Sequence, residues 1–388
     1  MSRQRGYLRI LFSSRVLLNL EAADAVYRQA YEQALTRGSE TRSARGEAVA
    51  AYSDFVACRG AYADGPYDPD VQGRRFAKGP LYDFALALSR LNRESGEDLV
   101  EIGLSAKDEA ESGITIFRNL DVTELGDHLG YRLLTCGNPV IQSFHDSFGT
   151  DLFLSRNSQD VQHARDHGVA SALIHFPDGW EYDHSERSGP LKIMVDGDGV
   201  AWGDKAEQRF RESVAQAGDF KEGLGRYAAL EARDFNTPIE RGPFTSVLEK
   251  ISRLNERFDR DEAPFQISLL TARGGKASTR ALTTLKDHDI ALNGFAEFKA
   301  GATKADGLRA HDPDVYFDDQ AGHLSEGRIC PAGLVFYVSD SPLHPQAAVS
   351  AGAGASRALP VPLMPWQRTG GRGMAAGMTH SHIAGKAQ

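Results

Sequence analysis

The sequence predicts an α/β fold made of two successive halves, each built on a parallel β-sheet. Three observations favour it. Short apolar runs alternate with segments of helical apolar spacing, the alternation begins again after a polar stretch at 177–190, and the second series repeats the order of the first. Strands that alternate with helices are typical of parallel sheets, and 388 residues are many for a single core. We therefore expect a first half at 1–176, a linker at 177–190 and a second half at 191–342.

The first half begins with an apolar strand at 8–12, and helical spacing follows at 17–35. The polar segment at 36–76 predicts an irregular or partly helical insertion. Pro80 suits the first turn of a helix that reaches Leu91. The remaining expected elements are a strand at 99–104, a helix at 109–119 and strands at 131–134, 151–154 and 170–176.

The second half begins with an apolar strand at 191–195, and 219–240 is a polar segment. The other expected elements are helices at 204–218, 243–255 and 277–287, a helix beginning at 301–304, and strands at 265–270, 314–317 and 334–338. Residues 343–388 are rich in Ala, Gly, Ser and Pro, which predicts a flexible tail.

Short motifs recur in the same order in both halves, which indicates an internal duplication. The alternative is the general likeness of any two α/β units. The matched segments are Lys78 to Asn92 with Arg241 to Asn255, Leu104 to Lys107 with Leu270 to Arg273, Gly137 to Val140 with Gly301 to Lys304, and Asp151 to Ser155 with Asp314 to Asp318.

Composition excludes several classes of function. The formal charge of −9 and pI of about 5.8 give no support to binding of nucleic acid or an anionic membrane. Three separated cysteines, Cys58, Cys136 and Cys330, form neither a disulfide framework nor a zinc pattern and suit a reducing compartment. No apolar run is long enough for a transmembrane helix. We expect a cytoplasmic protein.

Two carboxylates follow the strand at 191–195 in the stretch Asp196-Gly197-Asp198-Gly199. The glycines allow a tight turn and the close approach of another group. Asp196 and Asp198 are two residues apart, so both can lie on one face as the strand ends. Two acids this close repel unless a cation or a proton lies between them. The alternative is a strand followed by an ordinary Asp-Gly turn.

More polar residues follow other predicted strands of the second half. Thr271 and the pair Asp318-Asp319 come at strand ends, and Lys304 begins a helix. Ligands of open parallel sheets bind at the carboxyl ends of strands, so these residues can converge with Asp196 and Asp198. A set of carboxylates without His or Cys is an oxygen-only site that suits Mg²⁺. Lys304 and Thr271 are suitable donors to a phosphate.

One carboxylate of such a site can attack phosphorus, and the other can protonate the leaving oxygen and then deprotonate water. The alternative is that the acids are helix or turn caps and that Lys304 is a solvated charge. The first half argues for chemistry, because its matched positions carry different residues: Ser13, Arg15, Val140, Ser155 and Arg156.

This order of motifs resembles the haloacid dehalogenase-like phosphohydrolase superfamily and, more narrowly, the cytosolic 5′-nucleotidase type I family. The segments that carry the likeness are Val195 to Val200, Leu270 to Arg273, Phe317 to Gln320 and Leu154 to Asn157. It extends over about residues 8–340. The resemblance implies two Rossmann-like, haloacid dehalogenase-like halves, the second catalytic and the first degenerate. It also implies that an insertion at about 203–262 is a cap over the substrate.

The resemblance assigns roles to the residues of the second half. It implies Asp196 as the nucleophile that forms an aspartyl-phosphate and Asp198 as the general acid and base. Phosphate would be held by Thr271, Ala272, Arg273 and Lys304, and Mg²⁺ by Asp196, Asp198, Asp318 and Asp319. Arg273 and Arg280 are candidates for contacts with the base or the sugar, and structural ion pairs are the equal alternative.

The resulting expectation is a Mg²⁺-dependent 5′-nucleotidase that acts on nucleoside monophosphates such as AMP or a deoxynucleotide. A phosphatase for another small ester, such as a sugar phosphate, is the nearer alternative. The other is a nucleotide-sensing binding protein whose first half takes a nucleotide effector. A homo-oligomer is compatible with either function. Because a degenerate repeat can simply cover an apolar face of its partner, we favour a structural role for the first half.

Overall fold

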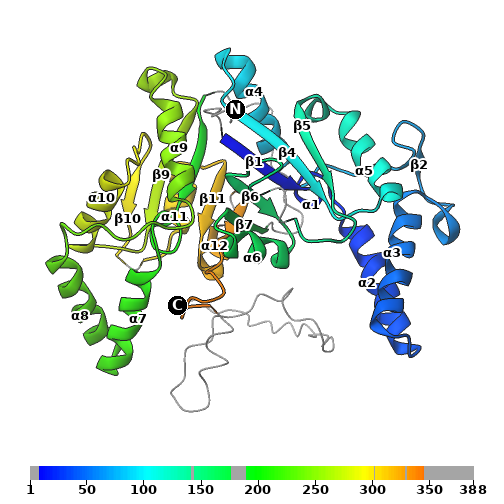
Figure 1. The fold of residues 1–388 in the computed structure, drawn as a ribbon. Coiled ribbons are helices and arrows are strands. Elements are labelled where there is room, and N and C mark those ends of the chain that lie inside the picture. Colours follow the sequence, from blue (N-terminus) through cyan, green and yellow to red (C-terminus); the bar gives the residue numbers. More distant parts are fainter. Residues whose placement is uncertain (1–7, 141–143, 176–188, 301, 328–329, 345–388) are drawn as a thin grey trace, which may run out of the picture.

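The computed structural model describes residues 8–140, 144–175, 189–300, 302–327 and 330–344. These residues form a ten-stranded sheet with helices on both faces, a mixed α/β architecture that fits a Rossmann-like fold (Figure 1). The strand order is β10-β9-β8-β11-β12-β7-β6-β1-β4-β5. All neighbours are parallel except β12 and β7, which are antiparallel.

The first half contributes five strands to this sheet. Its strands are β1 (Leu8–Ser13), β4 (Val100–Ala106), β5 (Leu129–Leu134), β6 (Leu152–Ser155) and β7 (Ala170–His175), with a separate hairpin of β2 (Tyr67–Asp68) and β3 (Gly73–Arg74). Its α-helices are α1 (Ser14–Leu17), α2 (Glu21–Thr36), α3 (Thr41–Val56), α4 (Tyr82–Ser95), α5 (Ala110–Asp121) and α6 (Ser158–Asp166).

The second half contributes the other five strands. They are β8 (Leu191–Val195), β9 (Phe265–Thr271), β10 (Ala296–Phe298), β11 (Val315–Asp318) and β12 (Ala332–Leu334). Its α-helices are α7 (Lys205–Ala217), α8 (Phe220–Arg233), α9 (Thr245–Asn255), α10 (Ala277–Asp287), α11 (Ala305–His311) and α12 (Ala321–Gly327).

The two halves share one sheet and one core, and their antiparallel junction is a feature that the expectation of a parallel sheet in each half did not include. The register of the junction pairs Ala332 with His175 and Leu334 with Leu173. Without this pairing, β7 and β12 would be open edges with unsatisfied backbone groups. The largest buried apolar cluster also crosses the junction, since Ile10 of β1 and Ile193 of β8 both belong to it.

The strands of the two halves follow the same spatial order. Read outward from the junction, the first half is β7-β6-β1-β4-β5 and the second is β12-β11-β8-β9-β10. Each half also places a pair of helices after its first strand, α2–α3 and α7–α8, which lie at opposite sides of the molecule in Figure 1.

A side-chain contact with the first strand recurs at matched positions of the two halves. The Asp151 carboxylate accepts the backbone N–H of Arg9 at 2.8 Å, as the Asp314 carboxylate accepts that of Lys192 at 2.7 Å. The expected match of Leu104 to Lys107 with Leu270 to Arg273 is shifted by one residue. In the structure Ile10 of β1 pairs with Ile102 of β4, and the corresponding Ile193 of β8 pairs with Ile267 of β9. This register places Ala106, not Ser105, level with Thr271.

Most expected elements are present, and the errors concern short or polar ones. The segment at 219–240 contains the 14-residue helix α8, which the sequence interpretation described as a polar segment. The last strand ends at Leu334, so the strand expected at 334–338 is displaced. Helices α6 and α12 and the short strand β10 were not expected.

Two expected segments fall largely or wholly on residues that the structure does not describe. The linker at 177–190 is described only from 189, and the tail at 343–388 only as far as 344. A membrane-spanning helix would have to be longer and more apolar than any helix in the described ranges.

Asn255 joins the end of α9 to the start of β9 and offers a test of this packing. Its amide donates to the carbonyl of Phe265 at 2.9 Å and its carbonyl oxygen accepts the N–H of Phe265 at 3.2 Å. We expect Asn255→Ala to lower the free energy of unfolding by about 1–3 kcal/mol, because the N–H of Phe265 loses its partner, while its carbonyl keeps the amide of Asn293 at 2.7 Å. Chemical denaturation measures this. Glu256→Ala, on the exposed neighbour, is the control, and equal effects of the two changes would contradict the assignment.

Candidate active site at the carboxyl ends of the second-half strands

Asp196 lies directly after β8, where the strand leaves the sheet. Its own N–H still donates to the carbonyl of Phe317 in β11 at 2.8 Å, and its side-chain Oδ1 accepts the N–H of Gly197 at 2.6 Å. A Cβ on Gly197 would lie 2.2 Å from the ring of Trp202, so only glycine fits there. Gly199 has φ of +74° and approaches the carboxylate of Asp319 closely. Both glycines are therefore required by the turn.

Lys304 lies between two carboxylates that belong to neighbouring strands. Its Nζ is 2.9 Å from Oδ2 of Asp196 and 2.8 Å from Oδ2 of Asp318, and its side chain is fully buried. Burial alone would lower the pKa of the Lys304 ammonium, but the two carboxylates raise it above its usual value. We call Lys304, Asp196 and Asp318 the lysine clamp.

The two carboxyl groups of the lysine clamp differ in pKa. Burial, with Asp318 and Asp198 nearby, raises the pKa of Asp196 to about 6 against the opposing effect of Lys304. Burial also acts on Asp318, but Lys304 and His323 outweigh it and lower the pKa of that carboxyl. Asp318 is therefore the more acidic of the two carboxyl groups.

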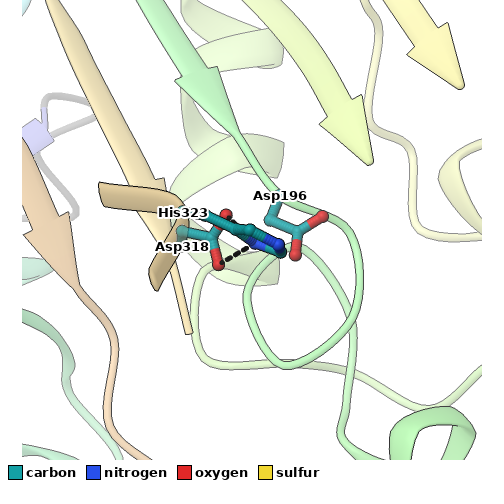
Figure 2. Close-up of side chains that lie close together, drawn as sticks. All are labelled: Asp196, Asp318 and His323. Carbon is teal, nitrogen blue, oxygen red and sulfur yellow. Dashed lines mark hydrogen bonds and ion pairs between the residues drawn. The ribbon is translucent and has the colours of Figure 1, made fainter. Parts of the chain in front are cut away.

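Asp318 is held by further donors around its buried carboxylate. The hydroxyl of Tyr316 donates to Oδ2, the N–H of Gln320 donates to Oδ1 at 2.8 Å, and Nδ1 of His323 is 3.1 Å from Oδ2. Figure 2 shows His323 between the carboxylates of Asp196 and Asp318. One potential ligand atom from each of these three residues lies within 4.8 Å of the others. The structure therefore brings a histidine to these acids that the sequence interpretation did not include.

Asp319 is buried beside the clamp and has an unused ligand atom. Its Oδ2 accepts the hydroxyl proton of Tyr337, while its Oδ1 has no hydrogen-bond partner among the described residues. Burial, together with Asp318 and Asp196, raises the pKa of Asp319 well above its usual value. A buried carboxylate oxygen without a donor is a suitable partner for a cation or for a water bound to one.

Asp198 forms a bidentate ion pair on the other side of the turn. Nε and Nη2 of Arg273 are each 2.8 Å from its oxygens, and Nε1 of Trp202 donates to Oδ1 at 3.0 Å. Burial would raise the pKa of Asp198, but Arg273 outweighs it and lowers it. Asp198 is therefore ionised in this arrangement.

Arg273 and Arg280 meet on one buried acid, Glu231 of α8. Nη1 of Arg273 is 2.6 Å from Oε2 of Glu231, and Nη1 of Arg280 is 2.6 Å from Oε1. Both guanidinium groups are buried and committed to these partners. The structure shows the ion-pair alternative for both arginines, and contacts with a base or sugar stay a prediction.

Thr271 and Ala272 lie at the end of β9, the neighbour of β8 in the sheet. Thr271 is buried, and its hydroxyl accepts the N–H of Arg273 at 3.3 Å. Ala272 is half-buried beside it. The structure therefore brings Asp196, Lys304 and Asp318 into direct contact, pairs Asp198 with Arg273, and places Thr271 and Ala272 on the adjoining strand end.

Sequence reasoning missed the side chains that support these acids. They are Trp202, Glu231, Tyr316, His323 and Tyr337. His323 lies in the first turn of helix α12, shortly after the Asp318-Asp319 pair, and an expected helix there would have indicated it. Glu231 follows Tyr227 by four residues on the buried face of α8, so a charge on an apolar face was the available signal.

Comparisons with known proteins agree with this arrangement. A protein-family model described as 5′-nucleotidase matches residues 59–341, a range that contains every site residue described above. Cytosolic 5′-nucleotidase 1B of Homo sapiens is 28% identical to this chain over 257 residues. That match covers 63% of this chain and 40% of the human protein, so the shared part is less than half of that relative.

Lys304→Met tests how strongly the lysine clamp depends on its cation. Removing the ammonium leaves two buried carboxylates facing each other, and breaking a buried ion pair typically costs about 3–5 kcal/mol. We expect a fall of that size in the free energy of unfolding, measured by chemical denaturation. Lys78→Met is the control, because Lys78 forms an exposed ion pair with Asp83 whose loss costs about 0–1 kcal/mol. A loss in the Lys304 variant as small as in the control would contradict this account.

Proposed function

The chain belongs to the 5′-nucleotidase family, and on this premise we propose that it hydrolyses nucleoside 5′-monophosphates to a nucleoside and phosphate. The lysine clamp is the observation that carries the proposal. It holds Asp196 and Asp318 against one buried ammonium, which offsets the charge of each carboxylate. Such a carboxylate can approach a phosphoryl group, because the neighbouring cation offsets the repulsion between two anions. The human relative is named as a cytosolic protein, and we propose the same compartment here.

We assign phosphate binding to Lys304, Thr271 and the backbone of Ala272. These groups lie at the ends of neighbouring elements around Asp196 and supply an ammonium, a hydroxyl and an N–H as donors. The side chain of Arg273 is committed to Asp198 and Glu231. We therefore give Arg273 a role in holding Asp198, and only its backbone remains available to phosphate.

The site also fits a divalent cation, and we propose Mg²⁺ bound by Asp196 and Asp318 with the backbone carbonyl of Asp198. The buried Oδ1 of Asp319, which has no hydrogen-bond partner in the part of the chain that the structure describes, supports this, because it would accept a hydrogen bond from a cation-bound water. Nδ1 of His323 is bonded to Asp318, so we assign His323 to orienting that carboxylate. When bound, the cation supplies positive charge to the phosphoryl oxygens.

In the proposed reaction, an oxygen of Asp196 attacks phosphorus and the bond from phosphorus to the 5′-oxygen breaks. Asp198 in its protonated form gives its proton to the leaving 5′-oxygen, which departs as the nucleoside hydroxyl. Water then attacks the aspartyl-phosphate, Asp198 takes the proton of that water, and the bond from phosphorus to Asp196 breaks. Phosphate is released, and both carboxylates return to their starting state.

We further propose that the α7–α8 hairpin, within the insertion at 203–262, covers the substrate. The charge of Asp198 affects the pKa of two side chains on this hairpin. Burial raises the pKa of Glu207 on α7, and burial raises that of Tyr227 on α8, with Asp198 adding to the shift in both cases. Side chains of both helices therefore lie near the proposed acid and base.

For the first half, we propose an origin by duplication and a structural role. The common strand order and the repeated Asp151 and Asp314 contacts support the duplication. Helix α6 supports the structural role, because Arg165 donates to the carbonyl of Phe336 at 2.7 Å and Gln162 to that of Tyr337 at 3.0 Å. The first half thereby fixes the segment that brings the Tyr337 hydroxyl to Asp319.

Asp196→Asn tests the nucleophile. The amide keeps the size of the side chain but cannot form an acyl phosphate, so we expect phosphate release from nucleoside monophosphates to fall by about 10³-fold or more. Release is measured with AMP, dCMP and IMP in the presence of Mg²⁺, and circular dichroism verifies the fold. Asp306→Asn, on an exposed acid of α11, is the control. Full activity of the Asp196 variant would remove this assignment.

Substrate class is tested with the wild-type protein on the same three nucleotides and on sugar phosphates. We expect kcat/KM to be higher for nucleotides, because the family and the relative both carry the 5′-nucleotidase description. A preference for a sugar phosphate would keep the chemistry but replace the proposed substrate.

A further inference from the structure

Glu231 is fully buried on a helix that the protein otherwise presents largely to solvent. Its carboxylate faces three guanidinium groups, those of Arg273, Arg280 and Arg209, at 2.6, 2.6 and 3.3 Å. An unpaired buried carboxylate would be costly, and these three guanidinium groups compensate that cost.

The partners of Glu231 come from three different places. Arg209 belongs to α7 of the same hairpin, Arg280 belongs to α10 of the sheet layer, and Arg273 follows β9 at the active-site edge. The pair with Arg280 anchors the hairpin to the sheet layer, and Arg280 also donates to the carbonyl of Thr237 at 2.9 Å. The additional bond to Arg273 extends the network into the active site.

Arg273 divides its donors between the hairpin and the turn after β8. Nε and Nη2 hold both oxygens of Asp198, while Nη1 holds Glu231. The guanidinium is planar, so its donors keep a fixed mutual geometry and cannot reorient independently. Trp202 limits its movement further, because its ring lies 5.6 Å from Cζ of Arg273 and its Nε1 donates to Asp198.

We propose that Glu231 is a positioning residue that ties the place of the α7–α8 hairpin to the orientation of Asp198 through the guanidinium of Arg273. With the hairpin against the sheet layer, Glu231 holds Nη1 of Arg273, and the other two donors present Asp198 in one orientation. When the hairpin moves away, Arg273 loses that bond and Asp198 loses its fixed support. The catalytic consequence rests on the proposed function, whereas the structural coupling does not.

The coupling between the α7–α8 hairpin and Asp198 acts in both directions, so it can be measured without an activity assay. If Arg273 links the two sites, removing the Asp198 carboxylate must loosen α8, although the hydrogen bonds that the structure gives this carboxylate go to Trp202 and Arg273. We expect amide hydrogen exchange in residues 220–233 to accelerate about fivefold or more in Asp198→Ala. Asp306→Ala is the control for loss of an acid outside the network. Unchanged exchange in Asp198→Ala would overturn the proposal.

The kinetic test uses Glu231→Gln, which removes the charge and keeps the shape. We expect kcat for nucleoside monophosphates to fall about 10- to 100-fold with a smaller change in KM, because misplacement of Asp198 affects the chemical steps. The control is Glu222→Gln on the same helix, where an exposed pair with Arg226 is lost and kcat stays unchanged. Faster exchange in α8 with kcat within twofold of wild type would show that Glu231 only anchors the hairpin.

A second variant is needed in case Glu231→Gln does not fold. Glu231→Gln with Arg280→Met removes one buried charge of each sign and leaves Arg273 paired with Asp198, so the network stays balanced. The same fall in kcat is expected, and wild-type kcat in this folded variant would overturn the proposal. If wild-type protein releases no phosphate from any nucleotide, the proposed function fails, while the exchange experiment still decides the coupling.

Discussion

The buried ammonium of Lys304 is the interaction on which the candidate site depends. Parallel pairing of β8 with β11 brings the ends of both strands to one edge, and each ends in a carboxylate, Asp196 and Asp318. Two buried anions at this spacing repel each other, so the sheet register is compatible with both only when a cation lies between them. The glycines after Asp196 follow from the same constraint, since the chain must turn tightly over Trp202 to keep that carboxylate on the lysine.

The first half shows that this sheet does not require the lysine clamp. Its strands follow the same order, yet Ser13 and Ser155 stand where the second half has Asp196 and Asp318. Its strand ends are neutralised locally instead, as in the pairs of Arg15 with Asp24 and of Lys107 with Asp160. Because the first half forms the same strand order without a lysine clamp, the fold does not depend on one. The lysine clamp of the second half is therefore better explained by chemistry than by stability.

Sequence patterns predicted the parts of the site that depend on strand ends, because a parallel sheet brings all its carboxyl ends to one edge. Asp196 and Asp318 were identified in this way, and Lys304 was identified at the start of a helix, although the three span more than a hundred residues. Helix α8 was missed because its sequence is polar on most faces and carries two glycines, Gly223 and Gly225. Because that helix was not expected, neither the burial of Glu231 nor its pairing with an arginine was expected. The contacts of Tyr337 also depend on how the chain leaves β12, which no local pattern encodes.

The pair of Asp198 with Arg273 imposes a condition on any acid and base role for this carboxyl. A bidentate guanidinium stabilises the ionised form and lowers the pKa of Asp198. That form suits the removal of a proton from water, but the preceding step needs a protonated carboxyl. The two steps therefore require different strengths of the same ion pair. A network in which Arg273 divides its donors between Asp198 and Glu231 supplies a means of changing that strength, because the position of one helix decides how many carboxylates share the guanidinium. Through Arg273, the buried charge of Glu231 is therefore linked to the change of protonation that the proposed reaction requires of Asp198.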